Sequence, residues 1–405
     1  MSRPFRFGVI FTHPTQHHSP LWQRLAKEPD LEIHVMYLSS ENTNKGTGDR
    51  ELGVKEPWDV DLLSGYKYEF LKNWNGQVSP LVKSSLICPS LNQRLKKQNI
   101  DAVWLSSFVT WSHRVAFLLC KLRGITIISQ NDGTIMSDTG YYNSAQQVMR
   151  SILYPFLYRL SDYWMPIGNH NEIYLRRYGV DESKMFPAPY PFDRKRFVET
   201  IGAQEDKIQK IREKYKWTNE TVLFGFAAKW IERKSPLDFI DAIKIAHQKN
   251  QNIRGLLIGG GVLEGEINKR LATMNGEVVK LGFVNQNQLP LYYAAMDVFT
   301  CPSRVDSHPL VVSEAMASGC PVILSDRCGN WGYSDIVQHK YNGIVYPWGN
   351  IEKFAEAILE LADKEVRACY SQRAKEIAAT QDLEVTAKNI MALVEKIKKS
   401  KCLKS

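Results

Sequence analysis

Short apolar segments alternate with amphipathic helical patterns along most of the chain, and this alternation limits the fold more strongly than any other feature. The second half shows it most clearly. Strands are predicted there at residues 222–228, 253–258, 278–284, 297–301 and 321–325, and helices at 236–249, 263–274, 288–295 and 309–317. Each helix separates two strands, which favours a parallel sheet with helices on both faces.

The first half follows the same plan, with longer irregular stretches. A helix is expected at 20–27, where Pro20 fits the first turn. Residues 41–80 are rich in Gly, Asn, Asp and Trp without a clear period, and we interpret them as a long loop. Apolar segments predict strands at 6–13, 31–38, 102–105, 126–129 and 163–167.

Chain length and a proline-rich stretch divide the sequence into domains. Its 405 residues exceed one ordinary domain and suit two. Pro187, Pro189 and Pro191 interrupt regular structure, so a linker is predicted at 187–196. We expect a Rossmann-like N-terminal, acceptor-side domain over 1–195 and a Rossmann-like donor domain over 196–380, which includes a helix at 352–362. The remaining segment, 381–405, is expected to form a helix at 383–399 and a basic tail, and to pack back on the first domain.

Two doubly wound domains direct the carboxyl ends of their strands toward a shared cleft, and ligands of such folds bind outside those ends. The loops that follow strands are therefore the places where chemistry is sought.

Composition excludes several classes of protein. No apolar run approaches the ~18 residues of a membrane-spanning helix and no apolar leader begins the chain, so we expect a cytoplasmic protein. The seven cysteines form no CxxC pair, which favours reduced thiols over disulfides or a zinc site. The net charge of +9 comes without a nucleic-acid motif, so no nucleic-acid partner is expected. Lysines crowd the last ten residues and leave an anionic membrane surface open as a partner.

The loop before the predicted helix at 309–317 carries the richest set of polar residues. Ser307 is expected to cap this helix, with Pro309 in its first turn. The free N–H groups and partial positive charge of such a helix start suit a diphosphate. Glu314 lies inside the helix, where a solvent-facing Glu is common, but Asp306 eight residues earlier favours a site.

Cations and glycines follow two other predicted strands. Lys229 and Lys234 come after the strand at 222–228, where they can neutralise a leaving diphosphate; a solvated charge cluster at a turn is the alternative. Three glycines with Gly260 in the middle follow the strand at 253–258. Glycines let the backbone approach a ligand closely, although such a turn is also common without one.

Together these residues resemble the retaining glycosyltransferases of family 4, which have the GT-B fold of two doubly wound, Rossmann-like domains facing across a cleft. The resemblance is strongest over 222–347. It rests on the paired cations Lys229 and Lys234, on Asp306 and Glu314 with seven residues between them, on the sequence 314–323, on Leu-Gly-Phe-Val at 281–284 and on Asn-Gly-Ile-Val at 342–345.

The resemblance implies a role for each matched residue. Lys229 and Lys234 would bind the donor diphosphate, Glu314 the ribose hydroxyls and Asp306 the sugar hydroxyls. Further donor contacts are expected from the helix start and from a strand end near the base, at Ser307, His308, Pro309, Leu310, Val311, Gly260, Phe283 and Val284.

The sequence departs from the family at three of these positions. Asp306 stands where Glu is usual, Lys229 stands where Arg is usual, and His308 replaces a glycine. Lysine lacks the bidentate geometry of arginine. These departures leave the identity of the donor sugar open.

The N-terminal half resembles the family only faintly. The family's glycine-rich first loop is replaced by a segment with His13, Gln16 and His17, which we interpret as an acceptor or phosphate contact rather than a metal site. Where the family often has a histidine after a mid-domain strand, Asp132 or Asn131 stands instead and takes the catalytic position.

Two further patterns have competing interpretations. Asp59 and Asp61 imitate a metal-binding DxD motif, but they lie in an irregular region, so no metal is expected there.

Residues 148–158 are apolar and aromatic and are followed by Arg159. They fit a buried helix, or a segment that meets a membrane or a lipid-linked acceptor.

The sequence therefore predicts a hexosyltransferase that uses a UDP- or GDP-linked sugar and a glycan or lipid-linked acceptor, on a membrane surface or free of one. No metal or other cofactor is expected, because two lysines and a helix start can carry the charge. A catalytically weak scaffold that binds sugar nucleotides is the alternative, motivated by the altered N-terminal loops. A dinucleotide-dependent oxidoreductase is disfavoured, since no GxGxxG follows Phe11 or Ala228.

Overall fold

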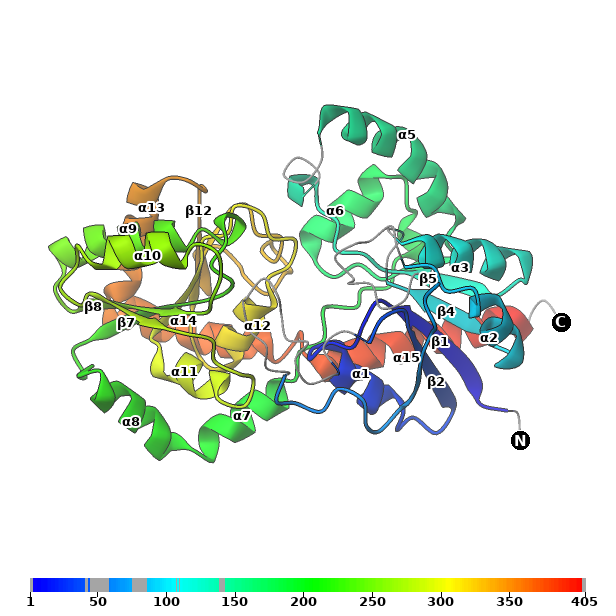
Figure 1. Cartoon of the computed structure of the whole chain (residues 1–405), viewed down its shortest axis with the longest axis horizontal. Coiled ribbons are helices and arrows are strands. Elements are labelled where there is room, and N and C mark those ends of the chain that lie inside the picture. The colour runs from blue at the N-terminus through cyan, green and yellow to red at the C-terminus, as the bar shows by residue number, and fades with distance from the viewer. Residues whose placement is uncertain are drawn as a thin grey trace.

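Two parallel sheets, each with six strands among the described residues, form the frame of the molecule (Figure 1). The computed structural model describes residues 3–40, 43, 58–74, 86–106, 108, 110–137 and 143–402. Each sheet lies between two clusters of buried apolar side chains, so helices cover both of its faces. This is the doubly wound architecture that the sequence predicts.

The first sheet has the strand order β3-β2-β1-β4-β5-β6. Its strands are β1 (Phe5–Phe11), β2 (Leu31–Tyr37), β3 (Lys67–Phe70), β4 (Ala102–Leu105), β5 (Thr126–Ser129) and β6 (Tyr163–Trp164). One face is covered by α1 (His18–Leu25) and by the C-terminal α15 (Leu383–Cys402), and the other by α2 (Leu91–Lys97) and α3 (Trp111–Leu122). Two more helices flank β6 in the chain, α5 (Ser144–Leu160) and α6 (Asn169–Arg177).

The second sheet has the order β12-β11-β10-β7-β8-β9. Its strands are β7 (Val222–Ala227), β8 (Ile253–Ile258), β9 (Val278–Leu281), β10 (Val298–Cys301), β11 (Val322–Ser325) and β12 (Gly343–Tyr346). One face carries α9 (Pro236–Lys249), α10 (Glu264–Leu271) and α13 (Ile351–Ala362). The other carries α7 (Arg194–Gly202), α8 (Glu205–Lys214), α11 (Leu289–Ala295), α12 (Leu310–Ala317) and α14 (Lys364–Ala378).

The chain crosses between the two sheets twice, and the two crossings touch. The first passes through the proline-rich segment 187–193, and the second leads from α14 into α15. Thr386 in α15 donates a hydrogen bond to the Pro189 carbonyl (2.8 Å), and Asn389 donates to the Pro187 carbonyl (2.9 Å). Because the apolar face of α15 lies in the core of the first sheet, the C-terminal helix ends in the N-terminal domain (Figure 1).

Several predicted elements differ from the structure. The loop predicted over 41–80 contains β3 at Lys67–Phe70; the rest of that prediction lies partly outside the described residues. The strand predicted at 163–167 is only Tyr163–Trp164. Helix α14 was not predicted at all, because few of its side chains are buried and its apolar period is weak.

Candidate functional site

A cavity of about 330 Å³ lies between the two domains, at the carboxyl ends of β7 and β8 and beside the first turn of α12. β7 is the fully buried centre of its sheet, with β10 and β8 as neighbours. Loops after adjacent parallel strands meet at one edge, which is why residues distant in sequence line one cavity. The predicted residues among its lining are Lys229, Lys234, Asp306, His308, Pro309, Leu310, Val311, Glu314, Phe283, Val284, Gln16 and His17.

Lys234 and Asp306 form an ion pair at one wall of this cavity. Both side chains are mostly buried, with 15% and 11% of their surface exposed. The two loops that carry them are also joined through the backbone, since the Arg304 amide donates to the Arg233 carbonyl (2.8 Å). A cation and an acid are therefore held side by side where the resemblance implies diphosphate and sugar.

Glu314 is a buried carboxyl at the cavity wall, on α12. The Tyr293 hydroxyl donates to its Oε2 (3.1 Å), and His17 Nδ1 lies 3.9 Å from its Oε1. Burial raises the pKa of Glu314 to about 7, against the opposing effects of Arg196 and the Tyr293 hydrogen bond. Burial lowers the pKa of His17 to about 4, so His17 is neutral at pH 7 and its contact with Glu314 is polar rather than ionic.

The first turn of α12 faces the cavity without a side-chain cap. The structure corrects the prediction for Ser307: the helix begins at Leu310, its N-cap residue is Pro309, and no side chain caps it. The segment before the helix is extended at Pro309, which leaves Ser307 too far back to reach the first-turn amides. Leu310 and Val311 line the cavity, so the positive end of the helix is available to an anion.

His308 is buried against this helix start. Its ring lies 5.3 Å from the ring of Tyr190, measured between centroids. Burial lowers the pKa of His308 to about 4, so the imidazole is neutral at physiological pH. Its Nδ1 is buried and has no hydrogen-bond partner among the described residues, and the residue lines the cavity.

Four predicted site residues lie outside the lining of the cavity. Besides Ser307, these are Gly260, His13 and Asp132. The Gly260 carbonyl accepts from the Trp230 amide (2.7 Å), and the neighbouring Gly259 lines the cavity in its place. His13 Nδ1 lies 3.0 Å from the Thr12 hydroxyl, and Asp132 is exposed.

Asn131, the other candidate for the histidine position, is engaged in structural contacts. Its Nδ2 donates to the Tyr158 hydroxyl (3.0 Å), and its Oδ1 accepts from the Gly133 amide (3.0 Å) and from Asn171 Nδ2 (3.1 Å). These bonds fix the loop after β5, and Asn131 is not among the residues that line the cavity.

The structure adds two residues that the sequence did not reveal: Trp58 lines the cavity, and Arg196 lies outside the lining but acts electrostatically on residues in it. Trp58 lies with its ring 5.8 Å from that of Phe283, across the domain boundary. Arg196 is held by the Gln286 carbonyl (2.8 Å) and side-chain oxygen (3.0 Å), and its charge acts on both His17 and Glu314. Neither residue stands in a motif: Trp58 reaches the cavity from the other domain, and Arg196 is placed by a segment 90 residues away in the sequence.

Asp59 and Asp61 make structural contacts in the described residues, Asp61 within its own turn and Asp59 with the other domain. Asp61 accepts from the amides of Leu63 (3.0 Å) and Ser64 (3.1 Å), as a turn-forming Asp does. Asp59 accepts from the Asn287 amide of the other domain (3.1 Å). Within the part of the chain that the structure describes, no group of three or more His, Cys, Asp or Glu is arranged to hold a metal ion.

Known proteins resemble the chain at the levels of family, sequence and fold. Residues 207–379 match the family model described as glycosyl transferases group 1. The UDP-Gal:alpha-D-GlcNAc-diphosphoundecaprenol alpha-1,3-galactosyltransferase of Escherichia coli is 26% identical over 239 residues, which cover 56% of this chain and 57% of that protein. The amylovoran biosynthesis glycosyltransferase AmsK of Erwinia amylovora is 24% identical over 297 residues, covering 70% of this chain and 66% of that protein. The chain thus spans under two thirds of the length of each of these curated relatives.

The whole chain is similar in fold to a solved structure. The crystal structure of Anabaena Alr3699/HepE in complex with UDP and glucose matches with a TM-score of 0.69 and 15% identity, over 97% of this chain and 100% of that one. A sequence identity of 15% supports only a shared fold. It confirms the predicted GT-B arrangement of two Rossmann-like domains.

Proposed function

We propose that this chain, whose residues 207–379 belong to the glycosyl transferases group 1 family, transfers a hexose from a nucleoside-diphosphate sugar to an acceptor hydroxyl. The observation that carries the proposal is the convergence of Lys234, Asp306 and Glu314 on one interdomain cavity, beside the uncapped start of α12. A cation and a helix start suit a diphosphate, and a buried carboxyl suits the two ribose hydroxyls.

The donor in this proposal spans the cavity wall formed by the second domain. The base lies near Phe283 and Val284, Glu314 accepts from the ribose, and Lys229 and Lys234 face the diphosphate. A uridine nucleotide is our first choice, because the names of the Escherichia coli relative and of the Anabaena structure both contain one. A GDP-linked sugar is the second choice.

The proposed reaction keeps the configuration of the donor sugar. The bond from the anomeric carbon to the diphosphate oxygen breaks, the acceptor oxygen bonds to that carbon from the same face, and its proton passes to the leaving phosphate. Charge grows on the diphosphate as the bond breaks, so Lys229, Lys234 and the α12 start stabilise the transition state more than the ground state. These groups supply the positive charge in our mechanism, which includes no metal ion.

The acceptor is proposed to be a glycan or a lipid-linked sugar presented at a membrane surface. The name of the Escherichia coli relative specifies a diphosphoundecaprenol-linked acceptor, which supports the lipid-linked choice. Gln16 and His17 line the cavity from the N-terminal domain and are the candidates for acceptor contact.

A sugar-nucleotide-binding scaffold is the second candidate. It is favoured by one observation: Asp132, at the position where the resembled family often has a histidine, is exposed and lies outside the cavity lining. Such a protein would bind the donor without turning it over.

Thermal unfolding in the presence of UDP-, GDP-, ADP- and TDP-sugars tests the donor site. A ligand at ~100 times its dissociation constant stabilises the fold by about 2.7 kcal/mol, which is a readily measured rise in Tm. Release of nucleoside diphosphate with a diphospholipid-linked sugar as acceptor then separates the two candidates. Stabilisation with turnover supports the transferase, stabilisation without turnover supports the scaffold, and no stabilisation by any of the four contradicts both.

A further inference from the structure

Helix α3 exposes a stripe of large apolar side chains on the N-terminal domain. Trp111, Val115, Leu118 and Leu122 recur every three or four residues, and Leu122 is 74% exposed. This spacing places them on one face of the helix. The opposite face, with Ala116, Phe117 and Cys120, is buried against the sheet, so α3 is apolar on both sides.

Helix α5 is even more apolar on its outer side. Ile152 is 74% and Phe156 is 63% exposed, whereas Arg150 and Tyr158 are its buried residues. An amphipathic helix of a globular protein normally shows the reverse pattern. The other large apolar side chains that α5 exposes are Val148, Met149, Leu153 and Leu160.

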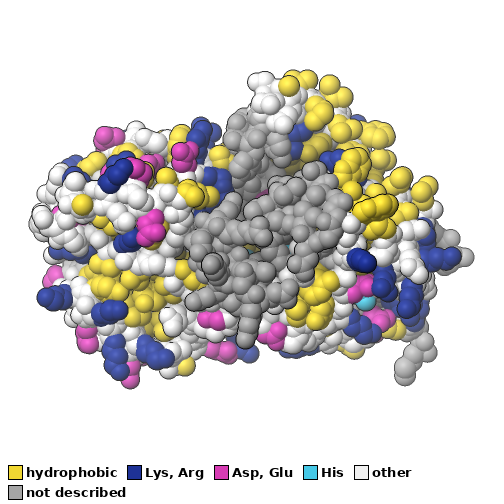
Figure 2. Space-filling model, in the orientation of Figure 1, with side chains coloured by type: hydrophobic (Ala, Val, Ile, Leu, Met, Phe, Trp, Pro, Cys, Tyr) yellow, Lys and Arg dark blue, Asp and Glu magenta, His cyan; other side chains and the backbone are white. Residues whose placement is uncertain are grey.

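The two stripes belong to one region of the surface. Phe108 packs between the helices, with its ring 5.3 Å from Phe117 of α3 and 6.0 Å from Tyr158 of α5. In Figure 2 apolar side chains gather at the upper right, where Figure 1 shows α5 and α3. We call these ten exposed side chains of α3 and α5 the α3–α5 face. Contiguous apolar surface of this kind marks an interaction site.

The border of the α3–α5 face is basic, and its cations are held by neutral oxygens. Arg114 donates to the Phe108 carbonyl (3.0 Å), Arg123 to Asn92 Oδ1 (2.6 Å) and Arg159 to the Gly179 carbonyl (3.4 Å). A neutral oxygen satisfies the hydrogen bond without cancelling the charge. The border therefore keeps a positive potential.

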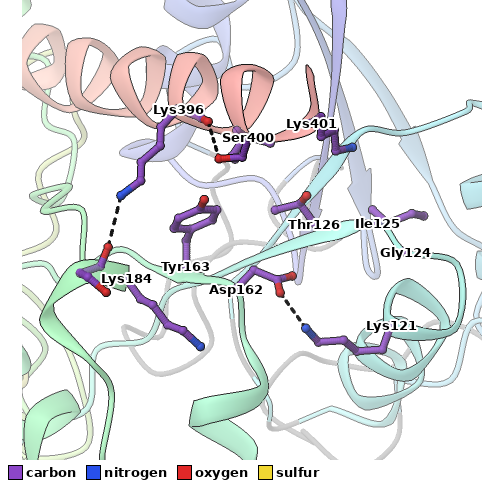
Figure 3. A pocket seen from close by; sticks show the side chains of 12 residues that line it. Lys121, Gly124, Ile125, Thr126, Asp162, Tyr163, Lys184, Lys396, Ser400 and Lys401 are labelled. Carbon is purple, nitrogen blue, oxygen red and sulfur yellow. Dashed lines mark hydrogen bonds and ion pairs between the residues drawn. The ribbon is translucent and has the colours of Figure 1, made fainter. Parts of the chain in front are cut away.

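A lysine-lined pocket of about 660 Å³ adjoins this border, where α3 ends and β6 begins (Figure 3). Lys121 pairs with Asp162 (2.8 Å), but Lys184 donates to the Arg159 and Ser161 carbonyls and Lys396 to the Ser183 carbonyl. Lys401 of α15 also lines the pocket; it donates to the Asp101 carbonyl (2.8 Å), and its Nζ lies 3.9 Å from the Asp101 carboxylate. The four lysines of the pocket thus outnumber the two carboxylates that they contact, Asp162 in the lining and Asp101 outside it, and this excess of positive charge suits a phosphate.

We propose that the α3–α5 face docks on an anionic lipid bilayer, with its apolar side chains in the headgroup–acyl boundary and the lysine-lined pocket against lipid phosphates. An apolar helix face bordered by Lys and Arg binds bilayers by both the hydrophobic effect and attraction to anionic lipid. A second copy of the chain fits less well, because a two-fold contact through this face would set one basic border against the other. The inference deepens the proposed function, in which the acceptor is presented at a membrane surface, and its test requires no sugar transfer, so the two can fail separately.

Co-sedimentation of the full chain with vesicles tests this docking. The vesicles are phosphatidylcholine alone or with about one third phosphatidylglycerol. The unchanged chain is expected to bind the anionic vesicles, and Ile152→Ser with Phe156→Ser to weaken that binding at least ~10-fold. Val262→Ser with Tyr333→Ser is the matched control, since both side chains are 84% exposed on the other domain. All four positions are exposed, and unchanged Tm values show that each variant folds.

The pocket has its own pair of variants. Lys396→Gln with Lys401→Gln should weaken binding to anionic vesicles roughly fivefold for each charge. Lys269→Gln with Lys353→Gln removes the same net charge from exposed ion pairs of the second domain and should leave binding unchanged. Equal binding to both kinds of vesicle, or no effect of the Ile152 and Phe156 changes, would overturn the proposal. So would a dimer in the absence of lipid that the same two changes dissociate.

Discussion

Lys234 reaches Asp306 from a different strand end, and each is the other's partner in a mostly buried pair. If Lys234 also faces the departing diphosphate, its loss removes a charge contact that strengthens in the transition state. Lys234→Ala should then lower donor turnover by at least ~10²-fold. The rate of nucleoside diphosphate release at saturating donor concentration measures this turnover. Lys353→Ala, an exposed lysine on α13, is the control, and near-normal turnover by the Lys234 variant would rule out the donor-site assignment.

The pKa of Glu314 predicts how the affinity for the donor changes with pH. The pKa is about 7 in the free protein. Ribose hydroxyls donate to the ionised carboxylate, so donor binding should lower this pKa and release a proton. Affinity for a UDP-sugar should therefore rise as pH increases from about 6 to 8. His17 and His308, with pKa values of about 4, do not titrate in this window.

Calorimetry in buffers of different ionisation enthalpy measures that proton release. A UDP-sugar is preferred to UDP, because it lacks a terminal phosphate that titrates near pH 6. Glu314→Gln should bind more weakly at pH 8 and lose the pH dependence. Affinity that stays constant from pH 6 to 8 in the unchanged protein would place the ribose elsewhere.

At the scale of elements, the sequence was most informative where strands are buried on both faces. β4, β5 and β8 have the predicted bounds, because runs of buried apolar residues end where the strands end. β3 was missed because it is an edge strand, and its sequence Lys-Tyr-Glu-Phe is mostly exposed and has no apolar run. The residues after β7 and β10 were predicted to meet from their places at strand ends. Arg196 and Trp58 were not, since Arg196 is placed by Gln286, far away in the sequence, and Trp58 by a contact with Phe283 of the other domain.

The turn after β8 should tolerate no side chain at Gly259. Its φ is +144°, and a Cβ there would lie 2.0 Å from the Ala228 carbonyl oxygen. Gly259→Ala should destabilise the fold by about 1–3 kcal/mol and weaken donor binding, because Ala228 and Gly259 both line the cavity. Chemical denaturation and the thermal-shift screen measure the two effects.

Gly265 in α10 is the matched control for that substitution. A Cβ at Gly265 meets nothing within 4 Å, and alanine favours the helix by roughly 0.5–1 kcal/mol. Gly265→Ala should therefore leave stability unchanged or raise it. If Gly259→Ala behaved like Gly265→Ala, the close contact between the loops after β7 and β8 would not constrain the site.

At the scale of the whole molecule, hydrogen bonds across the cleft hold the two domains together. Asp59 accepts from the Asn287 amide, and Asp335 accepts from the Asn169 amide (2.8 Å), each pair joining the two domains. Asp335 is buried, and burial raises its pKa to about 6. None of these residues lies in a motif that predicts such a contact, so a single sequence gives no signal for these contacts. Two domains could be predicted from the strands, but the shape of the cavity between them could not.

The return of α15 to the N-terminal domain makes the stability of that domain depend on the end of the chain. Leu393 is fully buried in the core of the first sheet, and Leu361 of α13 is its counterpart in the core of the second. Leu→Ala at either position should cost about 2–5 kcal/mol. Hydrogen exchange separates the two: Leu393→Ala should release the amides of β1 and β2, and Leu361→Ala those of β7 and β8. Equal loss of protection in both sheets from Leu393→Ala would mean that the domains unfold as one unit, with α15 stabilising both.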